Sequence, residues 1–244
     1  FLNTCHFDPP VMVRVHSANS LFDNFTNRSV YKLFKICSLN NLWYIFKLNW
    51  IKHEHHVRKK FLKNKATIFS FPGSKILEYM QSKTNLPGNK KYVVIPLTYY
   101  NEEYSGTQES EPVHITIPGS INQTRRNYQE VYEAFKKISS QLRQKTQLNL
   151  LGKPVSRSDR KIQQLLTTLE NEQLHINYYT NWVPAEDFIS GMQNTHFFIV
   201  PIKIKTNIRM VNEYYGYSKI SGNMNDIIYY GKPGIVSANY PLEA

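Results

Sequence analysis

Two short apolar runs near the end of the chain, joined by a glycine-bearing stretch, constrain its fold more than any other feature. The runs are His196-Phe-Phe-Ile-Val-Pro201 and Gly234-Ile-Val-Ser-Ala238. Apolar runs of this length are typical of strands buried in a parallel sheet. The stretch between them is long enough for a helix, which we expect to begin near residues 222–225. Parallel strands joined through helices form a doubly wound α/β sheet, whose ligands bind at the carboxyl ends of the strands.

The joining stretch contains the residue types of an anion-binding site. A helix that begins near Gly222 presents free backbone N–H groups and the positive end of its dipole to a ligand. Ser221 stands just before that position, and Lys219 adds a positive charge. Asp226, one turn into the helix, is placed to accept hydrogen bonds from a ribose diol. The pattern therefore favours a site for a nucleotide diphosphate.

The same stretch resembles the donor-binding segment of GT-B glycosyltransferases of the group 1 / family 4-like kind. That segment combines an acidic residue, a Phe/Tyr-Gly step, a second acidic residue on a helix and a Gly-x-Pro. Glu213, Tyr215-Gly216, Asp226 and Gly231-Lys-Pro233 stand at those places here. The two acids lie further apart than in the family's commonest form, and an insertion around residues 218–221 accounts for the difference.

The resemblance implies an α/β protein of GT-B type, with two Rossmann-like lobes, a cleft between them and an incomplete N-terminal lobe. It implies transfer of a sugar from a UDP- or GDP-sugar donor to a hydroxyl of a glycan or lipid-linked acceptor, with no metal and no other cofactor. His16 lies just after the end of the strand expected over residues 10–14. His16 and Glu213 would lie near the transferred sugar as catalytic residues. The donor would be bound by Gly119, Ser120, Arg125 or Arg126, Trp182, Val183, Lys219, Ser221, Gly222 and Asp226.

The second half of the chain alternates expected strands and helices. We expect strands at 113–117, 148–151 and 175–179, and helices at 125–144, 161–170 and 185–194. Gly119 follows the first of these strands and lets the backbone approach a ligand closely. Arg125 and Arg126, at the start of the next helix, carry planar donors that suit a diphosphate. Which of the two makes the contact stays open, and a solvated helix start is the alternative interpretation.

The expected organisation is two domains. Residues 1–109 form the remainder of an acceptor-side Rossmann-like domain, and residues 110–244 form the nucleotide-sugar-binding domain. The polar stretch 101–111 is the expected linker. Because the chain opens at Phe1 rather than Met and stops at Ala244 soon after a strand, we expect it to be a fragment without its N-terminal part and C-terminal tail.

A basic segment at residues 28–65 contains ten Lys and Arg residues against Glu54 alone, in a chain of net charge +12. Aromatic residues are interleaved with these charges. Such a segment suits an anionic membrane surface or an anionic acceptor. Contact with nucleic acid, or a solvated helix that docks its aromatic residues into the core, are the alternatives.

The remaining signals exclude several classes of protein. Residues 52–57 bring three histidines together, but Val57 stands where a His-Glu-x-x-His zinc motif needs histidine. Two cysteines, no signal peptide and no apolar run near 20 residues favour the cytoplasm, with peripheral attachment to the inner face of the membrane. The rival functions are a non-catalytic nucleotide- or polyanion-binding scaffold and a basic nucleic-acid-binding protein. The loop–helix cluster disfavours nucleic acid.

Overall fold

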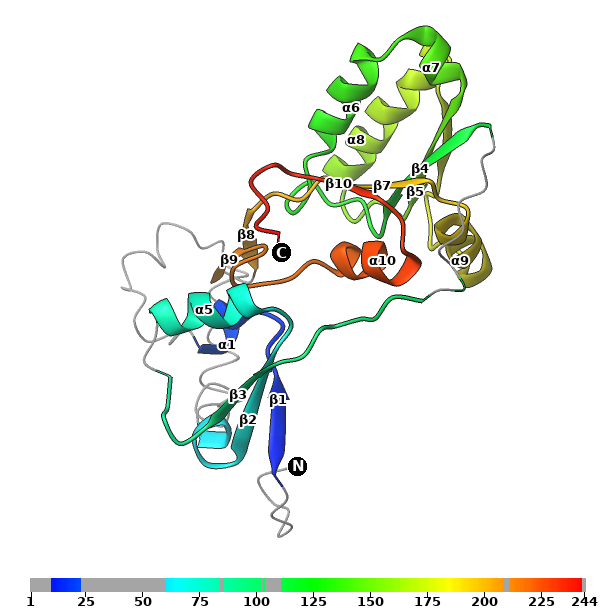
Figure 1. Ribbon diagram of the computed structural model, residues 1–244. Helices are drawn as coiled ribbons and strands as arrows, with labels where there is room; N and C mark the ends of the chain where they lie inside the picture. The colour runs from blue at the N-terminus through cyan, green and yellow to red at the C-terminus, as the bar shows by residue number, and fades with distance from the viewer. Residues whose placement is uncertain are drawn as a thin grey trace, which may run out of the picture. The chain divides into compact units, whose positions relative to one another are not determined.

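The computed structural model describes residues 10–22, 60–83, 86–101, 103, 111–208 and 211–242 (Figure 1). Contacts divide the chain into two compact units, Phe1–Ile95 and Pro96–Ala244. Most of the predicted linker lies outside the described residues, so the predicted boundary at residue 109 stays a prediction. Most of the basic segment 28–65, with its three histidines, also lies outside them.

The first unit contains a three-stranded parallel sheet in the order β1-β2-β3. Its strands are β1 (Val11–Arg14), β2 (Ala66–Phe71) and β3 (Lys91–Val94), and its helices include α1 (Ala18–Phe22) and α5 (Ser74–Lys83). The strand predicted at residues 10–14 is confirmed as β1. Phe69 and Phe71 of β2 are buried, and Phe69 stacks on Tyr92 with ring centroids 5.8 Å apart.

The second unit contains a five-stranded parallel sheet in the order β10-β7-β4-β5-β6. The strands are β4 (Val113–Pro118), β5 (Thr146–Leu151), β6 (His175–Tyr178), β7 (Phe197–Val200) and β10 (Gly234–Val236). The chain runs outward from β4 to β6 and then returns to the other side of β4 with β7. Strand order therefore reverses at β4, and in such sheets ligands bind at the carboxyl ends of the strands beside this reversal.

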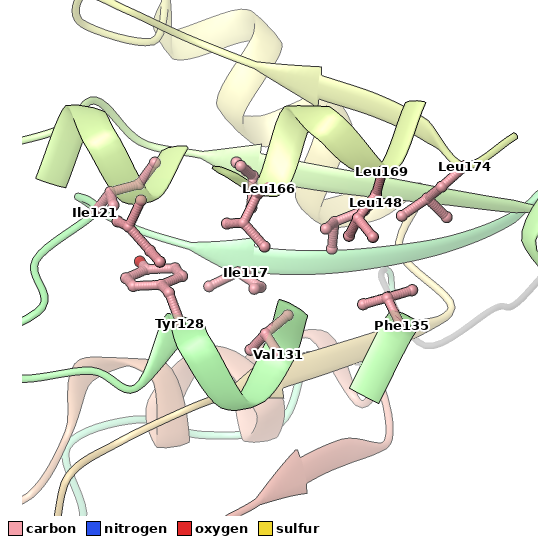
Figure 2. Packing of buried hydrophobic residues seen from close by; sticks show 11 residues of the cluster. Ile117, Ile121, Tyr128, Val131, Phe135, Leu148, Leu166, Leu169 and Leu174 are labelled. Atoms are coloured by element: carbon pink, nitrogen blue, oxygen red, sulfur yellow. The ribbon is translucent and has the colours of Figure 1, made fainter. Parts of the chain in front are cut away.

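Helices cover both faces of this sheet. They are α6 (Tyr128–Lys137), α7 (Ser140–Gln144), α8 (Arg157–Thr167), α9 (Ala185–Gln193) and α10 (Gly222–Tyr230), and the short helix η4 (Thr168–Glu172) follows α8. Side chains of α6 and α8 meet the sheet in one buried cluster, which includes Ile117, Val131, Leu148 and Leu166 (Figure 2). Side chains of α9 and α10 meet the opposite face in a second cluster. Strand β7 reaches both clusters, with Ile199 against the first and Phe198 and Val200 in the second, which explains why it is a continuous apolar run.

The predicted helix at residues 125–144 is wrong in two respects. It begins only at Tyr128, because Asn122 Oδ1 accepts hydrogen bonds from Thr124 N and Oγ1 in a local turn that competes with helix formation. It is also interrupted: Ile138 is extended, and Ser139 begins α7 by accepting a hydrogen bond from Leu142 N at 3.3 Å. Arg125 and Arg126 therefore lie in the loop before α6 rather than in its first turn.

Two further features differ from the sequence-based expectation. The helix predicted at 161–170 is α8, which begins earlier because Ser156 and Asp159 form a capping box at its start. The antiparallel hairpin of β8 (Lys205–Ile208) and β9 (Val211–Tyr214) was not expected. It lies between β7 and α10 in the chain and contains Glu213.

A pair of histidines lies at the amino ends of β4 and β7. The rings of His114 and His196 stack with centroids 5.7 Å apart and planes 12° from parallel. The backbone N–H of His114 donates to Nδ1 of His196 at 3.0 Å. Burial, and then the neighbouring charge of His196, lower the pKa of His114 below its usual value. The lowered pKa favours the neutral form of His114.

Candidate functional site

The loop after β4 contacts the loop after β5 through glycine. Gly119 has a φ of +82°, a conformation that favours glycine, and its N–H donates to Leu151 O at 2.9 Å. A side chain at Gly152 would overlap the backbone of Gly119 and Ser120. Close packing of the two loops therefore places Gly119 and the exposed Ser120 at the carboxyl ends of the central strands.

Arg126 connects this loop to the start of α10. Its Nη1 donates to Gly119 O and to Tyr128 Oη, each at 3.2 Å, and its Nη2 donates to Asn223 Oδ1 at 2.7 Å. Gly119 and Asn223 belong to segments far apart in the sequence. The guanidinium thus holds the β4 loop against the first turn of α10.

Asn223 completes the connection from the helix side. The residue is 6% exposed, and its Nδ2 donates to Pro118 O at 3.0 Å and to Asp226 Oδ2 at 3.2 Å. Asp226 is thereby fixed one turn into the helix. Sequence reasoning missed Asn223, although its i, i+3 spacing from Asp226 predicts neighbouring side chains on one helix face.

The amino end of α10 has the features of an anion site. Ser221 is the N-cap, and its side chain accepts a hydrogen bond from Asn223 N at 3.3 Å. The first turn contains no acidic residue, and a Cβ built on Gly222 meets nothing within 4 Å. An incoming anion can therefore approach the backbone of Gly222 at the positive end of the helix. The predicted helix start near residues 222–225 is confirmed.

Glu213 supports the turn between β9 and α10. It is 0% exposed, and its Oε2 accepts a hydrogen bond from Ser218 Oγ at 2.6 Å. Ser218 Oγ in turn accepts from Tyr214 N at 2.8 Å, and Gly216 N donates to Lys219 O at 2.7 Å. The buried carboxylate therefore fixes the turn that contains Lys219.

The charged groups of the site act on one another. Burial lowers the pKa of Lys219, an effect that the Glu213 carboxylate opposes and Arg125 reinforces. Burial raises the pKa of Asp226, and this increase is opposed by the hydrogen bond from Asn223 and by the charge of Arg126. Arg125, Arg126 and Lys219 thus face Glu213 and Asp226 in one cluster with an excess of positive charge.

The predicted site residues of the second unit lie in two places. Gly119, Arg126 and Asp226 are joined by the hydrogen-bond network, and Ser120, Arg125, Glu213, Lys219, Ser221 and Gly222 lie on the segments that the network connects. Trp182 and Val183 follow β6, two strands from β4 and so about 10 Å away across the sheet.

Two predicted residues have other surroundings. Trp182 is 80% exposed, and Lys153 Nζ lies 4.1 Å from the centroid of its ring, within the range of a cation–π interaction. His16 is exposed and belongs to the first unit, and its catalytic role stays a prediction.

Neither a metal centre nor a membrane span is found among the described residues. No group of three or more His, Cys, Asp or Glu side chains in this part of the chain could hold a metal ion. Within the same ranges, no helix is both long and apolar enough to cross a bilayer.

Comparison with known proteins gives matches in structure alone. No protein-family model matches the chain, and no curated protein matches it in sequence. The N-terminal domain of trehalose-6-phosphate phosphatase from Candida albicans is similar at 11% identity, with a TM-score of 0.46, over 73% of this chain and 46% of that chain. A UDP-forming α,α-trehalose-phosphate synthase from Burkholderia vietnamiensis matches at 12% identity with a TM-score of 0.44, over 75% of this chain and 47% of that chain.

A UDP-forming α,α-trehalose-phosphate synthase from Burkholderia xenovorans matches at 12% identity with a TM-score of 0.43, over 93% of this chain and 53% of that chain. The chain thus spans about half the length of these proteins. Because the TM-score of each of these three matches is below 0.5, we base no conclusion on these likenesses. The parallel sheets themselves confirm the predicted α/β class and the Rossmann-like organisation of the second unit.

Proposed function

We propose that the chain is part of a GT-B glycosyltransferase that moves a sugar from a UDP- or GDP-sugar to a hydroxyl of a glycan or lipid-linked acceptor. One observation carries the proposal. Arg126 and Asn223 hold the capped amino end of α10 against the Gly119 loop at the carboxyl end of β4. Backbone N–H groups, the positive charges of Arg125 and Lys219 and the Asp226 carboxylate then lie together where a doubly wound sheet binds nucleotides.

Arg125 is the proposed phosphate clamp. The guanidinium of Arg126 already donates to three acceptors of the protein, so its proposed role is to position the loop and the helix. Arg125 is exposed and carries the same planar fork of donors. Together with Lys219 and the N–H groups near Gly222, it would stabilise the negative charge that develops on the departing nucleoside diphosphate without a metal.

Asp226 is the proposed ribose ligand. Its Oδ2 accepts the hydrogen bond from Asn223, which fixes the rotamer and leaves Oδ1 for a hydroxyl of the ligand. A carboxylate held in this way suits a vicinal diol, because both ribose hydroxyls can donate to it. The loop of Trp182 and Val183 is the proposed contact for the base.

Glu213 is proposed to act through the turn that it supports. Its carboxylate is 0% exposed, so contact with a sugar requires the turn between β9 and α10 to open. In the closed turn, its bond to Ser218 positions Lys219 beside the donor phosphates. Loss of Glu213 should therefore displace the positive charge of Lys219. It should not remove a group that touches the sugar.

Calorimetric titration of the chain with UDP, GDP and their sugars tests the proposal. We expect a diphosphate to bind, Arg125→Ala to weaken binding, and Arg157→Ala, an exposed change outside the site, to leave it unaltered. A chain that binds a nucleotide sugar but neither transfers nor hydrolyses the sugar would fit the non-catalytic scaffold. Tighter binding to DNA than to any nucleotide sugar at matched salt would contradict the proposal.

A further inference from the structure

A pocket of about 350 Å³ lies between α8 and the chain that follows β6. Its lining includes Arg160, Gln163, Gln164, Tyr178, Thr180 and Asn181. None of these residues belongs to the proposed donor site, although Asn181 directly precedes Trp182. The volume is near the lower end of the range of about 300–1,000 Å³ that is usual for small-molecule sites. It therefore suits a ligand the size of one sugar ring better than a complete nucleotide sugar.

Gln163 provides a buried and fixed polar group in this pocket. The residue is 4% exposed, and its Nε2 donates to Tyr179 O at 3.0 Å. This bond occupies Nε2 and fixes the orientation of the amide. Oε1 is therefore ready to accept a hydrogen bond from a ligand in the pocket.

The other walls complete a surface that suits hydroxyl groups. Gln164, Thr180 and Asn181 offer both donors and acceptors, and Arg160 offers donors alone. No carboxylate lines the pocket. Tyr178 is 43% exposed, and its ring provides an apolar face for the C–H side of a pyranose. Side-chain amides and a hydroxyl can exchange hydrogen bonds with the hydroxyl groups of a ligand, and the aromatic face can pack against its C–H groups. The lining therefore suits a neutral polyhydroxyl compound.

We infer that this pocket is a subsite for one sugar residue, separate from the amino end of α10. Pro154, which also lines the pocket, pairs with Ile121 of the loop after β4. The subsite therefore lies at the same edge of the sheet as the candidate donor site. The inference does not require transferase activity, because sugar binding and diphosphate binding are measured separately. A nucleobase is the competing occupant, since the neighbouring loop of Trp182 is the proposed base contact.

The test is a titration of the chain by calorimetry and saturation-transfer NMR. The sugar probes are the methyl glycosides of glucose, galactose, mannose and N-acetylglucosamine, and UMP and GMP are the base probes. Gln163→Met keeps a similar volume and removes the amide, while Arg160→Ala removes an exposed donor. Arg157→Ala is the control, because this exposed arginine lies on the same helix outside the pocket.

At least one glycoside should bind the unaltered chain. Gln163→Met should reduce its affinity by about tenfold, the loss expected for one buried hydrogen bond, and Arg160→Ala should reduce it severalfold. Arg157→Ala should leave it unchanged. If Gln163→Met fails to fold, Arg160→Ala and Gln164→Ala, both at exposed positions, decide the outcome. The inference is overturned if no glycoside binds at millimolar concentration, if the pocket variants bind as tightly as the control, or if they weaken UMP or GMP but no sugar.

Discussion

Replacing Arg126 with alanine should destabilise the second unit, because this guanidinium connects the β4 loop to α10. Its strongest bond is the one to Asn223 Oδ1 at 2.7 Å. A hydrogen bond to a charged group contributes about 1.5–3 kcal/mol, and an acceptor left buried without a donor costs about 1–3 kcal/mol. Arg126 is half-buried, so water would replace part of the loss. We therefore expect a loss of about 2–3 kcal/mol in the free energy of unfolding.

For a chain of this length, such a loss corresponds to a fall in Tm of roughly 5–10 °C. Thermal denaturation followed by circular dichroism measures it. Arg125→Ala is the matched control, since an exposed change usually stays within about 0.5 kcal/mol. The expected pattern is a destabilised Arg126→Ala and a stable Arg125→Ala whose affinity for UDP or GDP is reduced. A stable Arg126→Ala variant, or an equally destabilised Arg125→Ala, would refute the division of roles between the two arginines.

Four further outcomes are expected. Asp226→Ala should weaken UDP or GDP binding by about 1–3 kcal/mol, the cost of a lost charged hydrogen bond, and an unchanged calorimetric affinity in the folded variant would exclude the ribose role. Glu213→Ala should lower Tm, since it leaves a cavity and removes the acceptor of the Ser218 hydroxyl, and an unchanged Tm would contradict the buried role. Because burial and its histidine neighbour lower the folded-state pKa of His114 below the usual 6.5, the unfolded chain binds that proton more tightly. Stability should be full above about pH 6.5 and decline as pH falls toward the folded-state pKa; a pH series of denaturation curves checks this, and a flat profile speaks against it. Segment 28–65 should bind liposomes only when they contain anionic lipid, with about 1 kcal/mol per basic residue near the surface, and co-sedimentation that ignores salt would disprove an electrostatic contact.

Local signals allowed much of the second unit to be predicted from the sequence. The apolar runs at Phe197–Val200 and Gly234–Val236 are strands β7 and β10. In β7 the apolar run continues because Ile199 packs in one cluster and Phe198 and Val200 pack in the other. Ser221 followed by Gly222 marked the start of α10, because an N-cap serine and a glycine are short-range signals. These predictions required no knowledge of residues distant in the chain.

The features that could not be predicted depend on neighbours distant in the sequence or on competing local bonds. Arg126 and Asn223 form a hydrogen bond across 97 positions of the sequence, and no spacing rule connects them. The sequence could therefore not decide whether Arg125 or Arg126 is available to contact the donor phosphates. The structure shows that Arg126 donates hydrogen bonds to acceptors of the protein itself. The break at Ile138 escaped prediction because the apolar spacing continues through it, while Ser139 begins a new helix. Burial of Glu213 depends on pairing with Thr206 in a hairpin that the sequence pattern did not indicate.

The most direct test of the central claim is a calorimetric comparison of nucleoside diphosphates with their monophosphates. If the amino end of α10, Arg125 and Lys219 bind the phosphates, UDP or GDP should bind at least about tenfold more tightly than UMP or GMP, since each added charged contact is worth about 1.5–3 kcal/mol. Arg125→Ala should reduce this difference while leaving monophosphate affinity nearly unchanged. Equal affinity for diphosphate and monophosphate, or no binding of either, would contradict the account.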